Sequence, residues 1–111
     1  MEIKSLTPEI GELERAVQWC ARETDIAGVP VVVSVQTRGK RANCGGWFAP
    51  LRFSTREGDL CHEINFCAEI LNAPPVTIVG IGAHEVVHRW CHWLGLKEVS
   101  KSGRHNKGFK H

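Results

Sequence analysis

Two histidines and a glutamate stand close together near the C-terminal third of the chain and could bind a metal ion. They form the pattern His84-Glu85-Val86-Val87-His88, or H-E-x-x-H. On a helix, residues four apart lie on one face, so both imidazoles can be directed at a single ion. The glutamate lies about 60° round the helix from the second histidine, beside a metal-bound water rather than on the metal. Two histidine ligands with a carboxylate base form the arrangement that zinc peptidases use.

The residues around this pattern favour a metal over an ordinary exposed helix. They are small and apolar: Ile78, Val79, Ile81, Ala83, Val86, Val87 and Trp90. Ionisable groups set into a largely buried helix are costly unless they are paired, and a metal relieves that cost. Two alternatives are a His-Glu pair on the wet face of a surface helix and a metal-free core helix in a small regulatory protein.

A catalytic zinc usually takes three protein ligands and leaves one position for water. His92 continues the four-residue spacing, but it lies about 12 Å along the helix from His84, too far for one ion with bonds of about 2 Å. Gly95 is the expected end of the helix. The third ligand is therefore expected on the segment that returns after this glycine. His105 is the leading candidate, with His111 and His62 as alternatives.

Length and composition are typical of one small intracellular domain. The 111 residues predict a single domain over 1–111. The chain has no run of eighteen apolar residues, and its acidic, amphipathic first residues are unlike a signal peptide, so a cytoplasmic protein without membrane contact is expected. Its five cysteines are an odd number and contain no C-x-x-C pair. That pattern argues against both a disulfide framework and a zinc ribbon.

The net charge of +2 hides two basic regions. Arg38, Lys40 and Arg41 fall in an expected hairpin turn, and the segment 97–110 is rich in lysine and arginine. Clusters of this kind can contact DNA phosphates, although they can also be ordinary solvated faces. DNA is therefore an expected partner through these two regions.

The elements that must position the histidines follow from periodicity and turn residues. A first helix is expected from Thr7, as cap, with Pro8 in its first turn, to about residue 24. Strands are expected over 29–35, 44–49 and 60–66, with Pro50 ending the second, and then a helical turn over 67–71. The long helix is expected from a cap at Asn72 to Leu94. Its Gly80 and Gly82 are expected to pack closely on the sheet or the first helix.

This order predicts an α+β domain with an N-terminal helix, a three-stranded sheet, the long H-E-x-x-H helix and a ligand-bearing C-terminal loop. The sheet is expected to be antiparallel, because the connections between consecutive strands are too short for crossovers. The helices are expected to pack on one face of it.

Several short motifs, in order, resemble those of the SprT-like family of zinc metallopeptidase domains, particularly the short forms of bacteria, phages and mobile elements. The resemblance runs from about residue 10 to the end. It is carried by Gly46-Trp47-Phe48, Glu63-Ile64-Asn65, Ala68-Glu69, Leu71-Asn72 with Pro74, His84-Glu85-Val86-Val87-His88, Ser102-Gly103-Arg104-His105-Asn106-Lys107 and Phe109-Lys110. It implies a zincin-like domain whose zinc is held by His84, His88 and His105, with Glu85 as catalytic base. Better-known relatives act on DNA-bound proteins.

The expected function is therefore that of a zinc-dependent metalloendopeptidase acting on proteins or peptides, DNA-associated proteins among them. The chain has no tyrosine, so the candidate oxyanion donors are Arg104, His92 and Asn106. Asn65 and Glu69 are candidates to orient the ligands, with structural pinning as the alternative. The alternative function is a DNA-associated binding module with a structural zinc, which a closed site with four protein ligands would favour.

Overall fold

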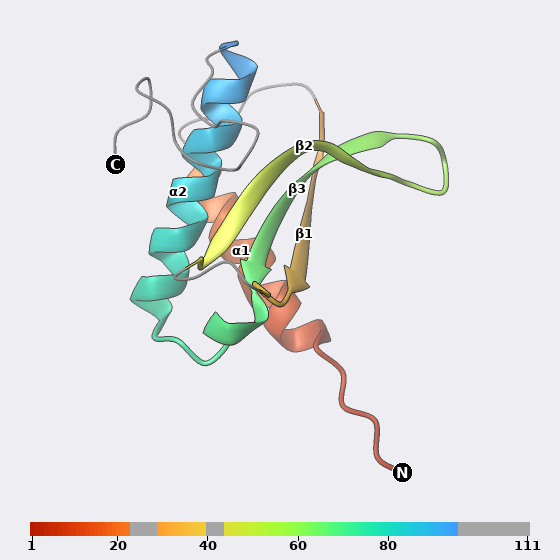
Figure 1. Cartoon of the computed structure of the whole chain (residues 1–111), viewed down its shortest axis with the longest axis vertical. Coiled ribbons are helices and arrows are strands. Elements are labelled where there is room, and N and C mark those ends of the chain that lie inside the picture. Colours follow the sequence, from red (N-terminus) through yellow and green to blue (C-terminus); the bar gives the residue numbers. More distant parts are fainter. Residues whose placement is uncertain (23–28, 40–43, 96–111) are drawn as a thin grey trace.

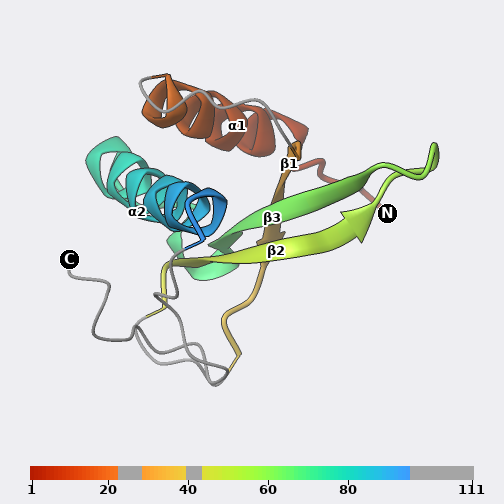
Figure 2. The same cartoon turned by 90° about the horizontal axis from the view of Figure 1, so that it is seen from above.

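The computed structural model describes residues 1–22, 29–39 and 44–95 (Figure 1). In chain order its elements are α1 (Thr7–Ala21), β1 (Val31–Gln36), β2 (Gly46–Ser54), β3 (Leu60–Cys67), the short 3-10 helix η1 (Ala68–Ile70) and α2 (Pro75–Trp93). Both long helices lie over the same face of the three-stranded sheet (Figure 2). The α+β class is therefore confirmed. No helix among these residues is long and apolar enough to cross a membrane.

The sheet is mixed, so the prediction of an antiparallel sheet was wrong. The strand order is β1-β3-β2, with β1 parallel and β2 antiparallel to the central β3. Short connections exclude a crossover only between consecutive strands. β1 and β3 are separated by residues 37–59, and this length includes β2 and is ample for a parallel pairing. The basic segment after β1 is consequently not a hairpin turn, because β1 and β2 both pair with β3.

β2 continues past the residue that was expected to end it. It runs to Ser54, although its register against β3 shifts between Ala49 and Phe53. Pro50 and Leu51 lie within this irregularity, and Leu51 has a φ of 52°. A proline is tolerated here because β2 is an edge strand, where a missing N–H breaks no ladder on the open side.

α1 begins as periodicity predicted, but with a different cap. Pro8 lies in the first turn, whereas Thr7 is already helical and Leu6 is the capping residue. Leu6 makes no side-chain capping hydrogen bond, but the Oγ of Ser5 accepts the N–H of Thr7 at 3.1 Å and so satisfies one of the first N–H groups of the helix. The expected end near residue 24 lies outside the described residues; the helical stretch ends at Ala21.

α2 starts three residues later than the predicted cap. Pro74 precedes the first helical residue, Pro75, and Asn72 lies in the turn that follows η1. Gly95 has a φ of 80°, and its N–H reaches the His92 carbonyl at 3.0 Å. This left-handed glycine confirms the predicted end of the helix.

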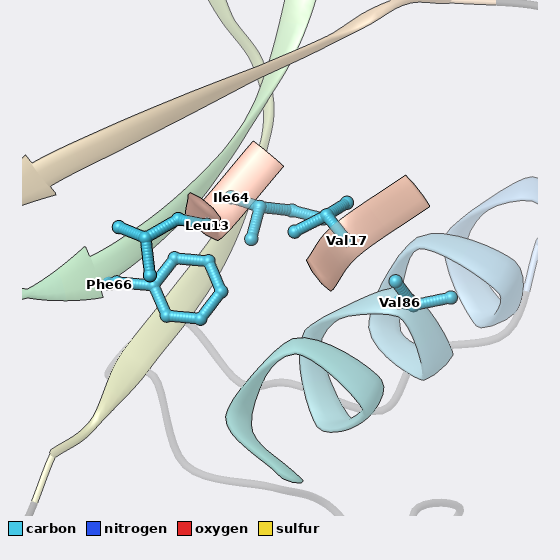
Figure 3. Close-up of a cluster of buried hydrophobic side chains, with 5 residues drawn as sticks. All are labelled: Leu13, Val17, Ile64, Phe66 and Val86. Atoms are coloured by element: carbon cyan, nitrogen blue, oxygen red, sulfur yellow. The ribbon is translucent and has the colours of Figure 1, made fainter. Parts of the chain in front are cut away.

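The core lies between α1, α2 and β3. It is built by Leu13, Val17, Ile64, Phe66 and Val86 (Figure 3). Since Ile64 and Phe66 face the helices, their alternating neighbours on β3 face the other side of the sheet. The core thus fixes which face of α2 packs on the sheet and, with it, the direction in which His84 and His88 point.

The two glycines of α2, Gly80 and Gly82, differ in how closely they pack. A Cβ on Gly82 would touch Phe66 at 3.6 Å and Cys20 at 3.7 Å, so this part of α2 packs closely, as expected. A Cβ on Gly80 would meet nothing within 4 Å. The prediction of close packing at Gly80 against the sheet or α1 was therefore wrong.

Candidate metal centre

α2 brings the two histidines of the H-E-x-x-H pattern together. The Nε2 atoms of His84 and His88 are 3.1 Å apart, and the ring centroids are 4.7 Å apart at an interplanar angle of 79°. His88 is buried and His84 is half-buried. The two imidazoles thus converge through corresponding nitrogens from consecutive turns of one unbroken helix.

This convergence fits a zinc ion. Two nitrogens each about 2.1 Å from a tetrahedral ion lie roughly 3.4 Å apart, close to the separation found here. In the absence of an ion, the same separation lets one neutral ring donate a hydrogen bond to the other. Zinc prefers neutral imidazole as its ligand. The hydrogen bond between the rings also needs at least one neutral imidazole, as its acceptor.

Glu85 is the most unusual group of the site. Its side chain is only 3% exposed, and its Oε1 accepts no hydrogen bond within the part of the chain that the structure describes. Burial raises the pKa of its carboxyl group to about 8. A buried carboxyl oxygen without a partner is costly, and it is the expected state of a base that awaits a cation and a water beside it.

The third ligand falls outside the described residues. His105 lies in the segment 96–111, as do His111 and the candidate oxyanion donors Arg104 and Asn106. Within residues 1–22, 29–39 and 44–95, no three His, Cys, Asp or Glu side chains come together to hold a metal ion. His62 is the alternative third ligand that lies within the described residues, and it does not form a metal-binding group with His84 and His88.

His62 instead belongs to an aromatic cluster further along α2. Its ring centroid lies 5.3 Å from that of Phe48 and 5.2 Å from that of His92. Its Nδ1 accepts the Leu51 N–H at 3.0 Å. Burial, and then the charges of His92 and Arg89, lower the pKa of His62 and favour its neutral form. His92 thus packs against β2 and β3 one turn beyond His88.

The two candidates for orienting the ligands make other contacts. Asn65 is fully buried on β3, where its Oδ1 accepts the Ser34 hydroxyl at 3.0 Å. Glu69 is exposed, and its Oε1 accepts the Arg38 N–H at 3.0 Å. That hydrogen bond is the main reason why the pKa of Glu69 is lowered. Both contacts hold the chain around β1 in place, as expected if Asn65 and Glu69 have a structural role.

The proposed DNA-contacting residues are only partly described. Arg38 is half-buried at the exit of β1. Lys40, Arg41 and the segment 97–110 lie outside the described residues.

Sequence reasoning missed the role of Glu63, a fully buried carboxylate in the centre of the sheet. Its Oε2 accepts hydrogen bonds from Ser34 Oγ at 2.7 Å and Gln36 Nε2 at 2.9 Å. Its Oε1 accepts the indole N–H of Trp47 at 2.7 Å. The polar residues at alternate positions of the first strand, Ser34 and Gln36, were the available signal, because they mark a polar sheet face.

No family model, curated protein or solved structure matches this chain. The function is therefore inferred from the chemistry of the residues themselves.

Proposed function

We propose that this protein is a zinc-dependent metallopeptidase of SprT-like type, in a zincin-like domain. His84 and His88 hold the ion, Glu85 acts as the catalytic base, and His105 supplies the third ligand. The observation that carries the proposal is the pair of Nε2 atoms 3.1 Å apart, next along the helix to the buried carboxyl group of Glu85, whose Oε1 has no hydrogen-bond partner among the described residues.

This set of groups suits hydrolysis better than a structural zinc. A structural zinc site is closed by four protein ligands, commonly cysteines. Here the pair is flanked by a carboxyl group that a helix places to one side of the ligand direction. None of the five cysteines lies in a group of three potential ligands among the described residues.

Zinc, when bound, supplies a Lewis acid that polarises a peptide carbonyl and lowers the pKa of a coordinated water toward about 7. Glu85 accepts a proton from the attacking water at a carboxylate oxygen and delivers it to the leaving amine. Its buried surroundings exclude competing water and keep its proton affinity high, which favours the second transfer. His92, Arg104 and Asn106 are the candidates to donate a hydrogen bond to the developing oxyanion.

The substrate class that fits is a protein or peptide. DNA-associated proteins are included because the basic residues Arg38, Lys40 and Arg41 and the segment 97–110 could contact DNA. A duplex would bring such substrates to the enzyme by contacting these side chains through its phosphates.

The test separates metal binding from turnover. Protein purified without chelators is assayed for zinc by elemental analysis, and for hydrolysis of labelled casein with and without duplex DNA. Glu85→Gln is expected to keep the zinc and lose activity by a factor of about 100 or more. His88→Ala and His105→Ala are expected to lose the zinc as well.

Equal zinc loss in Glu85→Gln and His88→Ala would contradict the role of Glu85 as a base that is not a ligand. Stoichiometric zinc with no hydrolysis by the wild-type chain on either substrate preparation would contradict the peptidase, and it would favour the binding module with a structural zinc.

A further inference from the structure

Two cysteines lie at the end of the sheet where β2 begins and β3 ends (Figure 1). Gly46 is paired with Phe66 in the antiparallel register. The N–H of Cys67 donates to the carbonyl oxygen of Gly45 at 2.9 Å, and Cys44 directly precedes that glycine. Opposite residues of adjoining strands have Cα atoms about 5 Å apart, and a disulfide spans about 4.4–6.8 Å between Cα atoms. The backbone therefore places Cys44 and Cys67 within reach of a disulfide.

A chain of hydrogen bonds directs the two sulfur atoms at each other. The side-chain amide of Asn65 donates to Cys67 Sγ at 4.0 Å, and the Cys67 thiol is hydrogen-bonded to the Cys44 thiol. The Cys44 thiol in turn donates to the carbonyl oxygen of Gly46 at 3.2 Å. Each sulfur is thus held by its own strand and faces the other, which is the arrangement that disulfide formation needs.

Two other cysteines donate to backbone carbonyls instead. The Cys20 thiol donates to the Val79 oxygen at 3.6 Å, and the Cys61 thiol donates to the Asp59 oxygen at 3.8 Å. Cys61 lies on the same side of β3 as Cys67, because the two are an even number of residues apart in one strand. The contact with a second thiol thus comes from the approach of Cys44 and not from this side of the sheet as such.

The two thiols of the pair differ in reactivity. Cys67 is fully buried, and its burial, followed by the neighbouring Cys44 thiol, raises its pKa to about 12. Cys67 is therefore a protonated and unreactive thiol at neutral pH. Cys44 is only half-buried, so a reagent from solution reaches this sulfur first. The pair combines an accessible cysteine with a buried one that can complete the reaction.

We propose that Cys44 and Cys67 are a reversible redox pair, which a small disulfide such as oxidised glutathione converts to an intramolecular disulfide. The Cys44 thiolate attacks one sulfur of glutathione disulfide, so a mixed disulfide forms and one glutathione leaves. The Cys67 sulfur then attacks the Cys44 sulfur, and the second glutathione leaves and takes up the proton of Cys67. Two protein thiols are oxidised by two electrons, and one glutathione disulfide is reduced to two glutathione molecules.

The disulfide would close a loop from residue 44 to residue 67, which contains the whole of β2 and β3. Closing a loop of about 24 residues restricts the unfolded chain and favours the folded one roughly 300-fold. By linkage, folding favours the disulfide by the same factor. The disulfide would also hold the start of β2 where Gly45 and Gly46 lie against Ile81, one turn before His84 on α2.

The experiment is a redox equilibrium of the full chain in glutathione buffers. Reduced and oxidised glutathione are mixed in graded ratios, the reaction is quenched with acid, and free thiols are alkylated. Mass spectrometry of proteolytic peptides then quantifies the link between Cys44 and Cys67. The wild type is expected to form this link in preference to any other, with an equilibrium constant at least about 100-fold higher in native buffer than in urea. This measurement uses the wild-type chain, so it does not depend on whether a variant folds.

Three variants assign the roles. Cys67→Ser is expected to keep a mixed disulfide with glutathione on Cys44, and Cys44→Ser is expected to leave Cys67 reduced. Cys61→Ser is the matched control, and it is expected to form the link like the wild type. Absence of the link in the native wild type, or equal equilibrium constants in native buffer and urea, would overturn the proposal. A mixed disulfide on Cys67 in Cys44→Ser would overturn the order of the two steps. These outcomes do not depend on zinc or on peptidase activity, because both cysteines lie outside α2.

Discussion

At the scale of single residues, the proposed hydrolysis depends on one buried carboxyl group. Glu85 is held on α2 among packed side chains, and its Oε1 has no hydrogen-bond partner among the described residues. Desolvation favours the protonated form, whereas a cation between His84 and His88 would favour the charged form. A metal bound to this pair would therefore determine whether Glu85 is a proton donor or a base.

The first prediction concerns the stability of the metal-free protein. Burial raises the pKa of Glu85 from 4.5 to about 8, so between these pH values the folded chain keeps a proton that the unfolded chain releases. The native state then binds more protons, and stability falls as the pH rises, by up to roughly 1.4 kcal/mol per pH unit. Below about pH 4.5 both states are protonated and this loss is absent.

Urea unfolding of chelator-treated protein from about pH 4.5 to about pH 8 measures this effect as a difference between the wild type and Glu85→Gln. The glutamine variant is expected to lose the Glu85 contribution and become relatively more stable at the higher pH. The exposed Glu57→Gln serves as control and is expected to follow the wild type. Parallel curves for the wild type and Glu85→Gln would rule out the raised pKa.

The second prediction concerns Glu63. Glu63→Gln replaces one acceptor oxygen by an amide N–H₂ group, while three donors still point at the position. At least one donor is then left unpaired in the sheet, and the free energy of unfolding is expected to fall by about 1–3 kcal/mol. The urea midpoint measures it. No loss beyond that of Glu57→Gln would mean that the buried network does not stabilise the fold.

At the scale of elements, the contact between α2 and β2 is set by small residues. A Cβ on Gly46 would collide with the Asn65 carbonyl oxygen and would lie 2.9 Å from Cγ2 of Ile81. Glycine is therefore required chiefly because β2 runs against the backbone of β3, and the Ile81 side chain of α2 packs on the same point. This contact holds the start of β2 beneath the helix that carries both histidines.

The third prediction compares two glycine-to-alanine variants. Gly46→Ala forces β2, β3 or α2 to move and is expected to cost about 1–3 kcal/mol or more. Gly80→Ala meets open space in a helix and is expected to stabilise the protein by up to about 1 kcal/mol. Thermal unfolding measures both. Similar changes in the two variants would contradict the packing described for α2.

At the scale of the whole molecule, the proposed zinc site is expected to couple metal binding to folding. An ion that binds only the folded chain stabilises it by about 2.7 kcal/mol at a hundredfold excess over its dissociation constant. For a domain of this size the melting temperature is then expected to rise on the order of 10 °C.

This fourth prediction is checked by thermal unfolding with zinc and with chelator. His88→Ala is expected to abolish the rise. His62→Ala is the matched histidine control, because His62 packs on Phe48 and His92 and not on the pair. It is expected to lower the baseline stability yet keep the rise. Loss of the rise in His62→Ala alone would make His62 a ligand.

The amino-acid sequence by itself determined the local features of this protein. The helix that carries His84 and His88, its end at Gly95 and the three strands follow from periodicity and from backbone preferences that act over a few residues. The convergence of the two imidazoles follows as well, because helix geometry alone puts residues four apart on one face. The place of His105 lies outside the described residues and stays a prediction.

Only the tertiary structure decided the order of the sheet and the burial of its polar groups. β3 lies in the centre because it pairs with β2 on one side and, on the other, residues 62–67 pair with residues 31–36 across a long stretch of chain, a choice that no local pattern encodes. The central position buries Glu63, and the packing of α2 buries Glu85. Burial depends on contacts between distant segments, so the raised pKa of Glu85 and the buried hydrogen bonds of Glu63 follow only from the folded chain.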